Sequence, residues 1–466
     1  MSLREYEAYL LYVRTTSDSL ILRAGRLTQQ YCVDQWAKLE QARLRFIENN
    51  QLQYRLETLQ GLADALRNES VEVHRVAADE EVRQRRASTR QASRSEDQLS
   101  QIEAAEIGHK IIISPSFTGE PRYMYQRFSD AMATVRETRA PSLFITMTYN
   151  PNWPEIKENL FRRGQKASDR PDIVARVFMQ KLKELNKDLD EGVFGIQAAR
   201  VHVVEYQKRG LPHAHILLIL RPVDKPVSAE DVDNLVWAEL PDKDKYPELY
   251  ETVISSMMYG SCGEQNPRSP CMKNGRCSKK FPKPFSEETT MSEDKYAAYR
   301  RPRRPRGRPR PSGFFSHKGK VWNNATVNQW VVPYNPFLSQ KYNCHVNVEI
   351  CATSKAIKYI YKYVYNGRNI SPVEACNRIF MHPIQGATHS VVNLPIHLED
   401  MNMVAYRGLA STTQLYNIIH RGSRSNLTEC LGYAPDILMQ PRDVPTKYTW
   451  DNKKWKPYKK YLPSIG

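Results

Sequence analysis

Residues 200–220 read RVHVVEYQKRGLPHAHILLIL, and this stretch decides the fold. Polar and apolar residues alternate before Gly210, and an uninterrupted apolar run, 216–220, comes after it. Alternation with a period of two, broken by a short glycine-containing connection, is typical of two antiparallel strands joined by a tight turn. The sequence therefore predicts a β-hairpin over residues 200–220.

Two histidines stand on the second strand of this hairpin. His213 and His215 are two residues apart, so their side chains leave the same face of the strand. Two imidazoles on a rigid strand can chelate one divalent metal ion, and the carbonyl oxygen of Gln207 on the partner strand can serve as a third ligand. A chance pair of surface histidines is the alternative. A histidine-triad hydrolase is disfavoured, because Leu217 stands where its nucleophilic histidine would be.

The composition indicates a protein that meets nucleic acid. A chain of 466 residues has room for about three domains. Its formal net charge of +17 is typical of proteins that bind a polyanion, and tyrosines among the Lys and Arg residues suit base stacking. The sequence has no apolar run long enough to span a membrane, no secretory signal and no P-loop, and its eight cysteines are spread out. We therefore expect no membrane association and a reducing, intracellular setting.

Composition and periodicity divide the chain into six segments. Before residue 79 the pattern is helical, with helices expected over 19–50 and 52–68. From residue 107 a helix, a strand at 143–148, a long helix starting near Pro171 and the hairpin follow one another, which is the order of an α+β domain with a mainly antiparallel sheet. The segments are an N-terminal helical region (1–78), a polar linker (79–106), the first part of the α+β domain (107–225), an insertion with Cys-rich and Arg/Pro-rich runs (226–341), a strand and a tyrosine-rich helix that complete the domain (342–370), and a C-terminal region (371–466).

A cysteine cluster lies in the insertion. Cys262, Cys271 and Cys277 are separated by Pro and Gly residues, as in a zinc knuckle. A fourth ligand is not local, and three reduced thiols in an irregular loop are the alternative. The distant candidates for the fourth ligand are Cys344, His345 and Cys351.

The run YRRPRRPRGRPRP, 299–311, carries seven arginines among prolines. Such a run cannot form a helix, and it suits phosphate binding or nuclear targeting, with a solvated loop as the alternative. The arginines that we expect to contact DNA are Arg300, Arg301, Arg303 and Arg304.

Residues 354–366, SKAIKYIYKYVYN, predict a helix that Gly367 closes. At about 100° per residue, Tyr359 and Tyr363 fall on one side with Lys362, whereas Tyr361 falls on the apolar side. Two phenols beside a lysine and near a metal ion are a plausible nucleophile arrangement, although tyrosines that merely pack are the alternative.

Three of these stretches resemble the motifs of one family. LFITMTYNPNWPEI (143–156), VVEYQKRGLPHAHILLIL (203–220) and AIKYIYKYVYNG (356–367) are similar, in this order, to the three motifs of the Helitron Rep domain. That domain is the two-tyrosine HUH endonuclease of rolling-circle DNA transposons. The resemblance extends over most of the chain, including the Cys-rich segment, and it implies an HUH nuclease core, an antiparallel sheet flanked by helices.

Carried over residue by residue, the resemblance implies that His213 and His215 are the HUH metal pair and that Tyr359 and Tyr363 are the paired tyrosines. Gln207 lies where related nucleases place a third, usually acidic, ligand. A glutamine there departs from the pattern, which leaves Glu205 as a rival ligand.

The implied function is a metal-dependent single-stranded DNA endonuclease and strand transferase. With Mg²⁺ or Mn²⁺ bound, one tyrosine would attack the scissile phosphate and keep the 5′ phosphate, while Lys362 would lower a phenol pKa or hold a phosphate. The expected partner is single-stranded DNA at transposon ends and target, in the nucleus. In the family a helicase belongs to the same polypeptide, and this chain stops before one, so we expect that unwinding is either absent or was removed with that part. The alternative function is a non-catalytic, zinc-dependent nucleic-acid-binding protein.

Overall fold

The computed structural model divides the chain into two compact units. The first unit comprises Met1–Glu40 and Thr118–Val391, and the second comprises Gln41–Phe117 and Val392–Gly466. Each unit is described by itself below. The structure describes residues 1–14, 19–51, 54–58, 60, 62–64, 109–110, 121–161, 164–207, 210–260, 262–263, 266–292, 295–303, 313–317, 319–351, 370–392, 394, 396–398, 401–407, 410–420, 425–430, 443–451 and 454–458.

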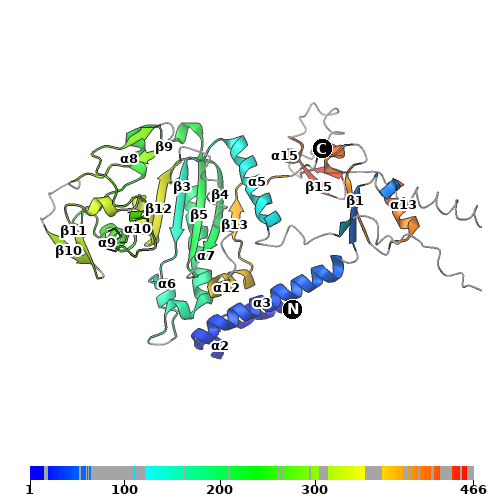
Figure 1. The fold of residues 1–466 in the computed structure, drawn as a ribbon, viewed down its shortest axis with the longest axis horizontal. Coiled ribbons are helices and arrows are strands. Elements are labelled where there is room, and N and C mark those ends of the chain that lie inside the picture. Colours follow the sequence, from blue (N-terminus) through cyan, green and yellow to red (C-terminus); the bar gives the residue numbers. More distant parts are fainter. Residues whose placement is uncertain are drawn as a thin grey trace, which may run out of the picture. The chain divides into compact units, whose positions relative to one another are not determined.

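A five-stranded antiparallel sheet forms the centre of the first unit (Figure 1). The hairpin predicted from residues 200–220 supplies two of its neighbouring strands, and the predicted strand 143–148 pairs with the second of them. The sheet order is β12 (His345–Ile350), β3 (Leu143–Thr148), β5 (Pro212–Leu220), β4 (Gln197–Tyr206) and β13 (Gln385–Ala387).

Two helices cover the two faces of this sheet. On one face, Ile145 and Ile216 belong to the same buried cluster as Phe178 of α7 (Pro171–Asp190). On the other, Phe144 and Leu217 share a cluster with the α5 helix (Pro121–Thr138). Because side chains alternate along a strand, neighbouring residues of β3 and β5 serve opposite cores. Helices packed on both faces of an antiparallel sheet confirm the predicted α+β class.

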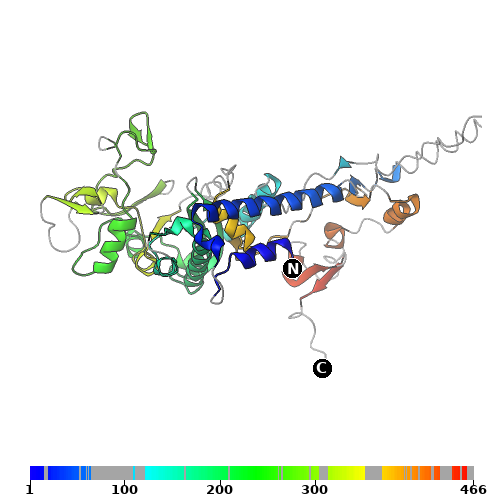
Figure 2. The same ribbon diagram turned by 90° about the horizontal axis from the view of Figure 1, so that it is seen from below.

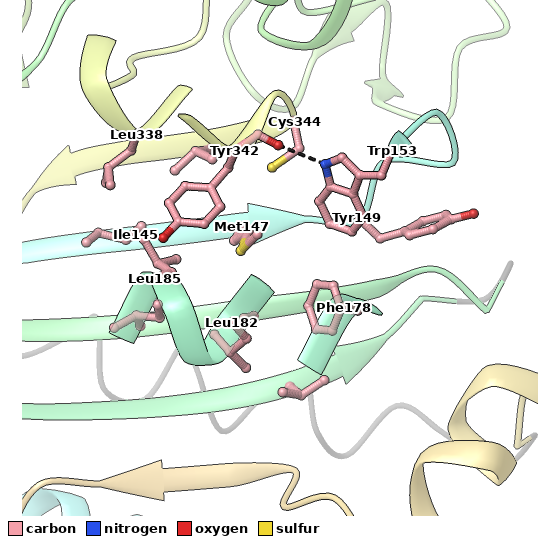
Figure 3. Packing of buried hydrophobic residues seen from close by; sticks show 14 of the residues in the cluster. Ile145, Met147, Tyr149, Trp153, Phe178, Leu182, Leu185, Leu338, Tyr342 and Cys344 are labelled. Carbon is pink, nitrogen blue, oxygen red and sulfur yellow. Dashed lines mark hydrogen bonds between the residues drawn. The ribbon is translucent and has the colours of Figure 1, made fainter. Parts of the chain in front are cut away.

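The buried cluster between the sheet and α7, which we name the α7 core, also includes a residue of the loop that follows β3. Trp153 is buried, and its indole N–H donates a hydrogen bond to the carbonyl oxygen of Tyr342, 2.8 Å away (Figure 3). Tyr342 is the last residue of α10 (Pro336–Tyr342), and the short α6 (Pro154–Lys157) follows Trp153 directly. This contact fixes the end of β3 from which the loop leaves.

The N-terminal helices α1 (Leu3–Leu10), α2 (Leu20–Arg23) and α3 (Arg26–Gln51) confirm most of the predicted helical region. Figure 2 shows α1 running alongside α3, and the Tyr31 hydroxyl donates to the Glu7 carboxylate at 2.5 Å. The helix predicted over 52–68 is wrong at its start, because residues 54–58 form a strand instead, β1 (Tyr54–Thr58). On the sheet's α7 side, α12 (Pro372–Ile379) packs against α7.

The insertion predicted over residues 226–341 has a buried core of its own. Leu240, Val253, Trp322 and Tyr334 are among the residues of this core. Its helices are α8 (Ala229–Leu235) and α9 (Pro247–Ser256), and its hairpins are β6 (Met272–Lys273) with β7 (Arg276–Cys277), β8 (Thr290–Ser292) with β9 (Lys295–Ala298), and β10 (Phe314–His317) with β11 (Lys320–Asn323).

The second unit is built around a small antiparallel sheet in which β1 lies between two partners from distant parts of the chain. The two partners are β2 (His109–Lys110) and β14 (Met403–Arg407). Outside this sheet, the described part of the unit includes α13 (Thr412–His420), α15 (Val444–Lys447) and the hairpin of β15 (Tyr448–Asp451) with β16 (Lys454–Pro457). Within the described ranges, every helix is too short or too polar to span a bilayer.

Candidate active site

The two histidines lie on the central strand β5, between β3 and β4. In the register, His213 is opposite Thr148 on β3 and Glu205 on β4, while His215 is opposite Thr146. Directly opposed residues of antiparallel strands point to the same face, so these five side chains share the α5 face of the sheet. The ring of Phe144 stacks on His215 with centroids 5.7 Å apart and closes one side of the group.

Two threonine hydroxyls hold the imidazole rings. The Thr148 hydroxyl lies 2.9 Å from Nδ1 of His213, and the Thr146 hydroxyl lies 3.1 Å from Nδ1 of His215. When Nδ1 of a histidine is engaged in this way, Nε2 is the nitrogen left for a metal ion or an acid. Both histidines are buried, with 9% of His213 and 8% of His215 exposed. Their rings therefore have little room to turn, and the threonine hydroxyls fix their orientation.

The two Nε2 atoms have different surroundings. Nε2 of His215 lies 3.0 Å from a carboxylate oxygen of Glu205. Nε2 of His213 is buried and has no hydrogen-bond partner among the residues that the structure describes. A buried nitrogen without a partner is costly, and a bound cation would satisfy it. The donor set of two imidazoles and a carboxylate therefore fits a divalent metal ion.

Burial also keeps His213 in the form that binds metals. Burial, with a smaller contribution from the neighbouring His215 and His345, lowers the pKa of His213 to about 3. The ring is therefore neutral at physiological pH, and only a neutral imidazole has a lone pair on Nε2 to offer.

Comparison with known proteins bears on this group of residues. Residues 6–218 match the family model described as the Helitron helicase-like domain at the N-terminus. This part of the chain is therefore similar to the N-terminal domain of Helitron proteins. No curated protein matches the chain. The matched range contains β3, α7, β4 and both histidines, so the site lies within it. The similarity also supports the association with nucleic acid that the charge predicts.

The sequence predicts Gln207 as the third metal ligand, with Glu205 as the rival. Gln207 is exposed, and its backbone closes the hairpin turn: its carbonyl oxygen accepts from the N–H of Gly210 at 2.7 Å. Glu205 is the residue whose carboxylate touches the histidine pair. The geometry therefore favours Glu205.

The histidine pair and Glu205 form a more open group than the cysteines of the insertion. Among the described residues, the one group of three or more His, Cys, Asp or Glu side chains whose ligand atoms all lie within 4.8 Å of one another is Cys262, Cys271 and Cys277.

The tyrosines predicted as nucleophiles, Tyr359 and Tyr363, lie with Lys362 outside the described residues. The described chain resumes at Ile370, and the next residue is placed beside the hairpin turn. A Cβ added to Gly210 would lie 3.0 Å from Cβ of Ser371, and the φ of +77° at Gly210 itself requires glycine. The predicted tyrosine helix is thus followed closely by a residue that packs beside the turn leading into His213.

Two arginines of the Arg/Pro-rich run serve the fold, in contrast to the exposed DNA contacts predicted for them. Arg301 is 4% exposed, and its guanidinium donates to the carbonyl oxygens of Ala238, Asn328 and Val331. Arg300 pairs with the Glu239 carboxylate at 2.7 Å. These contacts leave Arg301 unavailable to a phosphate. The exposed Arg303 stays a predicted contact, and Arg304 lies outside the described residues.

Sequence reasoning missed the two threonines. Thr146 and Thr148 have the same spacing on β3 as His213 and His215 on β5. That matched spacing is a usable signal, but it acquires meaning only when the register between β3 and β5 is known.

Proposed function

We propose that this chain is a metal-dependent endonuclease and strand transferase of single-stranded DNA, which cuts through a tyrosine. The observation that supports the proposal best is the pair of buried imidazoles, each held at Nδ1 by a threonine, with Glu205 beside them in a Helitron-related domain. This arrangement is what an HUH nuclease core would require of the sheet. The charge of +17 supports a nucleic-acid substrate.

In this proposal the side chains of His213, His215 and Glu205 hold one Mg²⁺ or Mn²⁺. When bound, such an ion withdraws negative charge from a phosphate oxygen and so favours attack on phosphorus. Thr146 and Thr148 keep both Nε2 atoms oriented toward the ligand position, and the β3–β5–β4 register keeps the three ligands on one rigid surface.

The bond changes are carried by a tyrosine. The phenol oxygen of Tyr359 or Tyr363 forms a bond to phosphorus, and the bond from phosphorus to O3′ breaks. The phenol gives its proton to solvent, and O3′ takes up a proton from solvent as it leaves. The products are a 5′-phosphotyrosine and a free 3′ hydroxyl. Attack by the 3′ hydroxyl of another strand reverses the same bond changes and joins the strands, and a second tyrosine allows two such cycles.

The proposal is tested by capturing the covalent product. The protein is incubated with single-stranded oligonucleotides and Mn²⁺ and then run on a denaturing gel. An oligonucleotide labelled at its 3′ end should migrate with the protein, because the fragment downstream of the cut carries the 5′ phosphate. The same oligonucleotide labelled at its 5′ end should yield a shorter free fragment. The His213→Ala, His215→Ala double variant should form no adduct and still bind DNA, because binding is spread over many basic groups.

A non-catalytic, zinc-dependent nucleic-acid-binding protein is the second candidate, and the cysteine cluster favours it. It predicts DNA binding without any covalent species under all metal conditions. Absence of an adduct with single-stranded oligonucleotides that the protein demonstrably binds would favour this candidate over the nuclease.

A further inference from the structure

Three cysteines of the insertion meet at one point. Cys262, Cys271 and Cys277 offer sulfur atoms that all lie within 4.8 Å of one another, and no disulfide joins them. Zinc bonds to sulfur at about 2.3 Å, which places the thiolates of a tetrahedral site about 3.8 Å apart. The three sulfurs are therefore close to the separation that one zinc ion requires.

Two hydroxyl groups lie beside the cysteine sulfurs. The Ser269 hydroxyl is 3.2 Å from the Cys271 sulfur, and the Cys277 thiol donates to the Tyr259 hydroxyl at 3.9 Å. The chain between Cys271 and Cys277 is a tight hairpin, β6 with β7, whose turn uses positive φ at Asn274 (50°) and Gly275 (74°). The hairpin therefore holds the thiols of Cys271 and Cys277 near each other on a fixed backbone.

The segment around these cysteines has no hydrophobic core of its own. In residues 266–283, which we name the basic knuckle, every side chain is exposed or only partly buried. One end is anchored, because Phe281 stacks on Tyr259 with ring centroids 4.1 Å apart and Lys283 pairs with the backbone of Gln329. A segment this small without buried apolar residues needs a cross-link to keep one shape.

The basic knuckle carries charge of one sign. It contains six basic residues and no acidic one. Five of the six are exposed. A compact group of this kind matches the phosphates of a nucleic-acid backbone. The basic residues are Arg268, Lys273, Arg276, Lys279, Lys280 and Lys283.

We propose that Cys262, Cys271 and Cys277 bind one zinc ion, which fixes the basic knuckle in a shape that binds a nucleic-acid backbone. Zinc takes four ligands, and within the described part of the chain these three side chains supply three of them. The more distant candidates from the sequence serve other contacts: Cys344 is fully buried in the α7 core, and Nδ1 of His345 lies 2.8 Å from the carbonyl oxygen of Ser256. The zinc site shares no residue with the histidine site, so the experiments can refute one proposal and leave the other standing.

The metal is tested first by elemental analysis of the full chain purified without added metal. We expect close to one zinc per chain, loss of zinc in Cys277→Ser, and unchanged zinc in Cys376→Ala, a buried cysteine outside the cluster. Cobalt substituted for zinc should show sulfur-to-cobalt charge-transfer absorption, which Cys277→Ser should abolish. Folded wild-type protein without zinc, or the same zinc content in Cys277→Ser, would overturn the metal assignment.

The structural role is tested by trypsin, because the knuckle exposes cleavable basic residues. Zinc-loaded protein should resist cutting after Lys273 and Arg276, and protein stripped by a chelator should be cut there first. Equal resistance with and without zinc would show that the ion does not fix the knuckle.

The nucleic-acid contact is tested in the catalytically silent Tyr359→Phe, Tyr363→Phe background, so that cleavage plays no part. Lys273→Gln with Arg276→Gln should weaken binding of single-stranded DNA several-fold and lower the slope of log affinity against log salt by about one to two. Lys183→Gln with Lys187→Gln is the matched control, because both lysines are exposed on α7, on the opposite side of the sheet from the histidines. Equal effects of the two double variants would remove the knuckle from the binding surface.

Discussion

The carboxylate of Glu205 lies 3.0 Å from Nε2 of His215, although the residue directly opposite Glu205 in the sheet is His213. The side chain thus reaches diagonally across the two strands. This contact leaves Nε2 of His213 buried and without a partner among the described residues. In the function proposed above, a metal ion bound by the histidines would satisfy Nε2 of His213.

The first prediction separates the two candidates for the third ligand. Glu205→Gln keeps the shape of the side chain but removes its charge, and it should weaken Mn²⁺ binding by at least about 100-fold, since even residues that only orient ligands cost 10–100-fold when lost. Gln207→Ala should leave Mn²⁺ affinity nearly unchanged, because Gln207 is exposed at the turn. Calorimetric titration with Mn²⁺ measures both. A larger loss of Mn²⁺ affinity in Gln207→Ala than in Glu205→Gln would identify Gln207 as the third ligand.

The second prediction concerns the threonines that hold the rings. Thr148→Val removes the hydroxyl 2.9 Å from Nδ1 of His213 and keeps the shape of the side chain. The ring then loses its fixed orientation, and Mn²⁺ affinity should fall about 10–100-fold. Thr138→Val is the control, because its hydroxyl donates only to the Thr134 carbonyl oxygen within α5. If both variants bind Mn²⁺ as the wild type does, the threonines do not orient the ligands.

The sequence alone predicted the sheet around the site well, because local patterns determine it. The alternation of LFITMT fixed the bounds of β3, and the glycine-containing connection fixed the hairpin. Contacts between distant segments were not accessible in this way. β1 pairs with β14 from the far end of the chain, so its alternation was hidden in a helical region. The threonine contacts depend on the β3–β5 register, and the burial of Arg301 depends on carbonyl groups from two distant segments, one at Ala238 and one at Asn328 and Val331.

The third prediction concerns the edge of the sheet. A Cβ at Gly386 of β13 would overlap Cε1 of His202 and lie 2.9 Å from its Nε2. Gly386→Ala should therefore lower the free energy of unfolding by about 1–3 kcal/mol. In Gly260→Ala the new Cβ would meet only the flexible end of Lys320 at 3.6 Å, so that variant should stay near wild type. Adding His202→Ala should recover part of the loss in Gly386→Ala. Denaturant unfolding that shows no such recovery would locate the clash elsewhere.

The fourth prediction is the effect of acid on stability. Burial, and then the charge of Arg200, lowers the pKa of His202 to about 4, from an unfolded value of about 6.5. The folded state disfavours the protonated ring, so this contribution to stability is complete above about pH 6.5 and is lost as the pH falls toward 4. His202→Gln should flatten the fall in unfolding free energy over that window. Some slope should remain, because the pKa of His213 is lowered in the same direction. An unchanged profile in His202→Gln would mean that His202 does not titrate in this range.

The last prediction concerns the two tyrosines and the direction in which their helix faces. At about 100° per residue, Tyr361 falls within about 60° of Ile357 and Val364, while Tyr359 and Tyr363 fall on the opposite half of the helix. Tyr359→Phe and Tyr363→Phe each keep the ring and remove one nucleophile. Each alone should weaken nicking or strand transfer, because the other phenol can still attack, and together they should eliminate the covalent protein–DNA species. Tyr361→Phe, the matched control, keeps both predicted nucleophiles and should still form the adduct. The gel assay with the 3′-labelled oligonucleotide reads all four variants. Adducts that persist in the double variant and vanish in Tyr361→Phe would show that the helix faces the other way, and adducts in all four would place the nucleophile outside this helix.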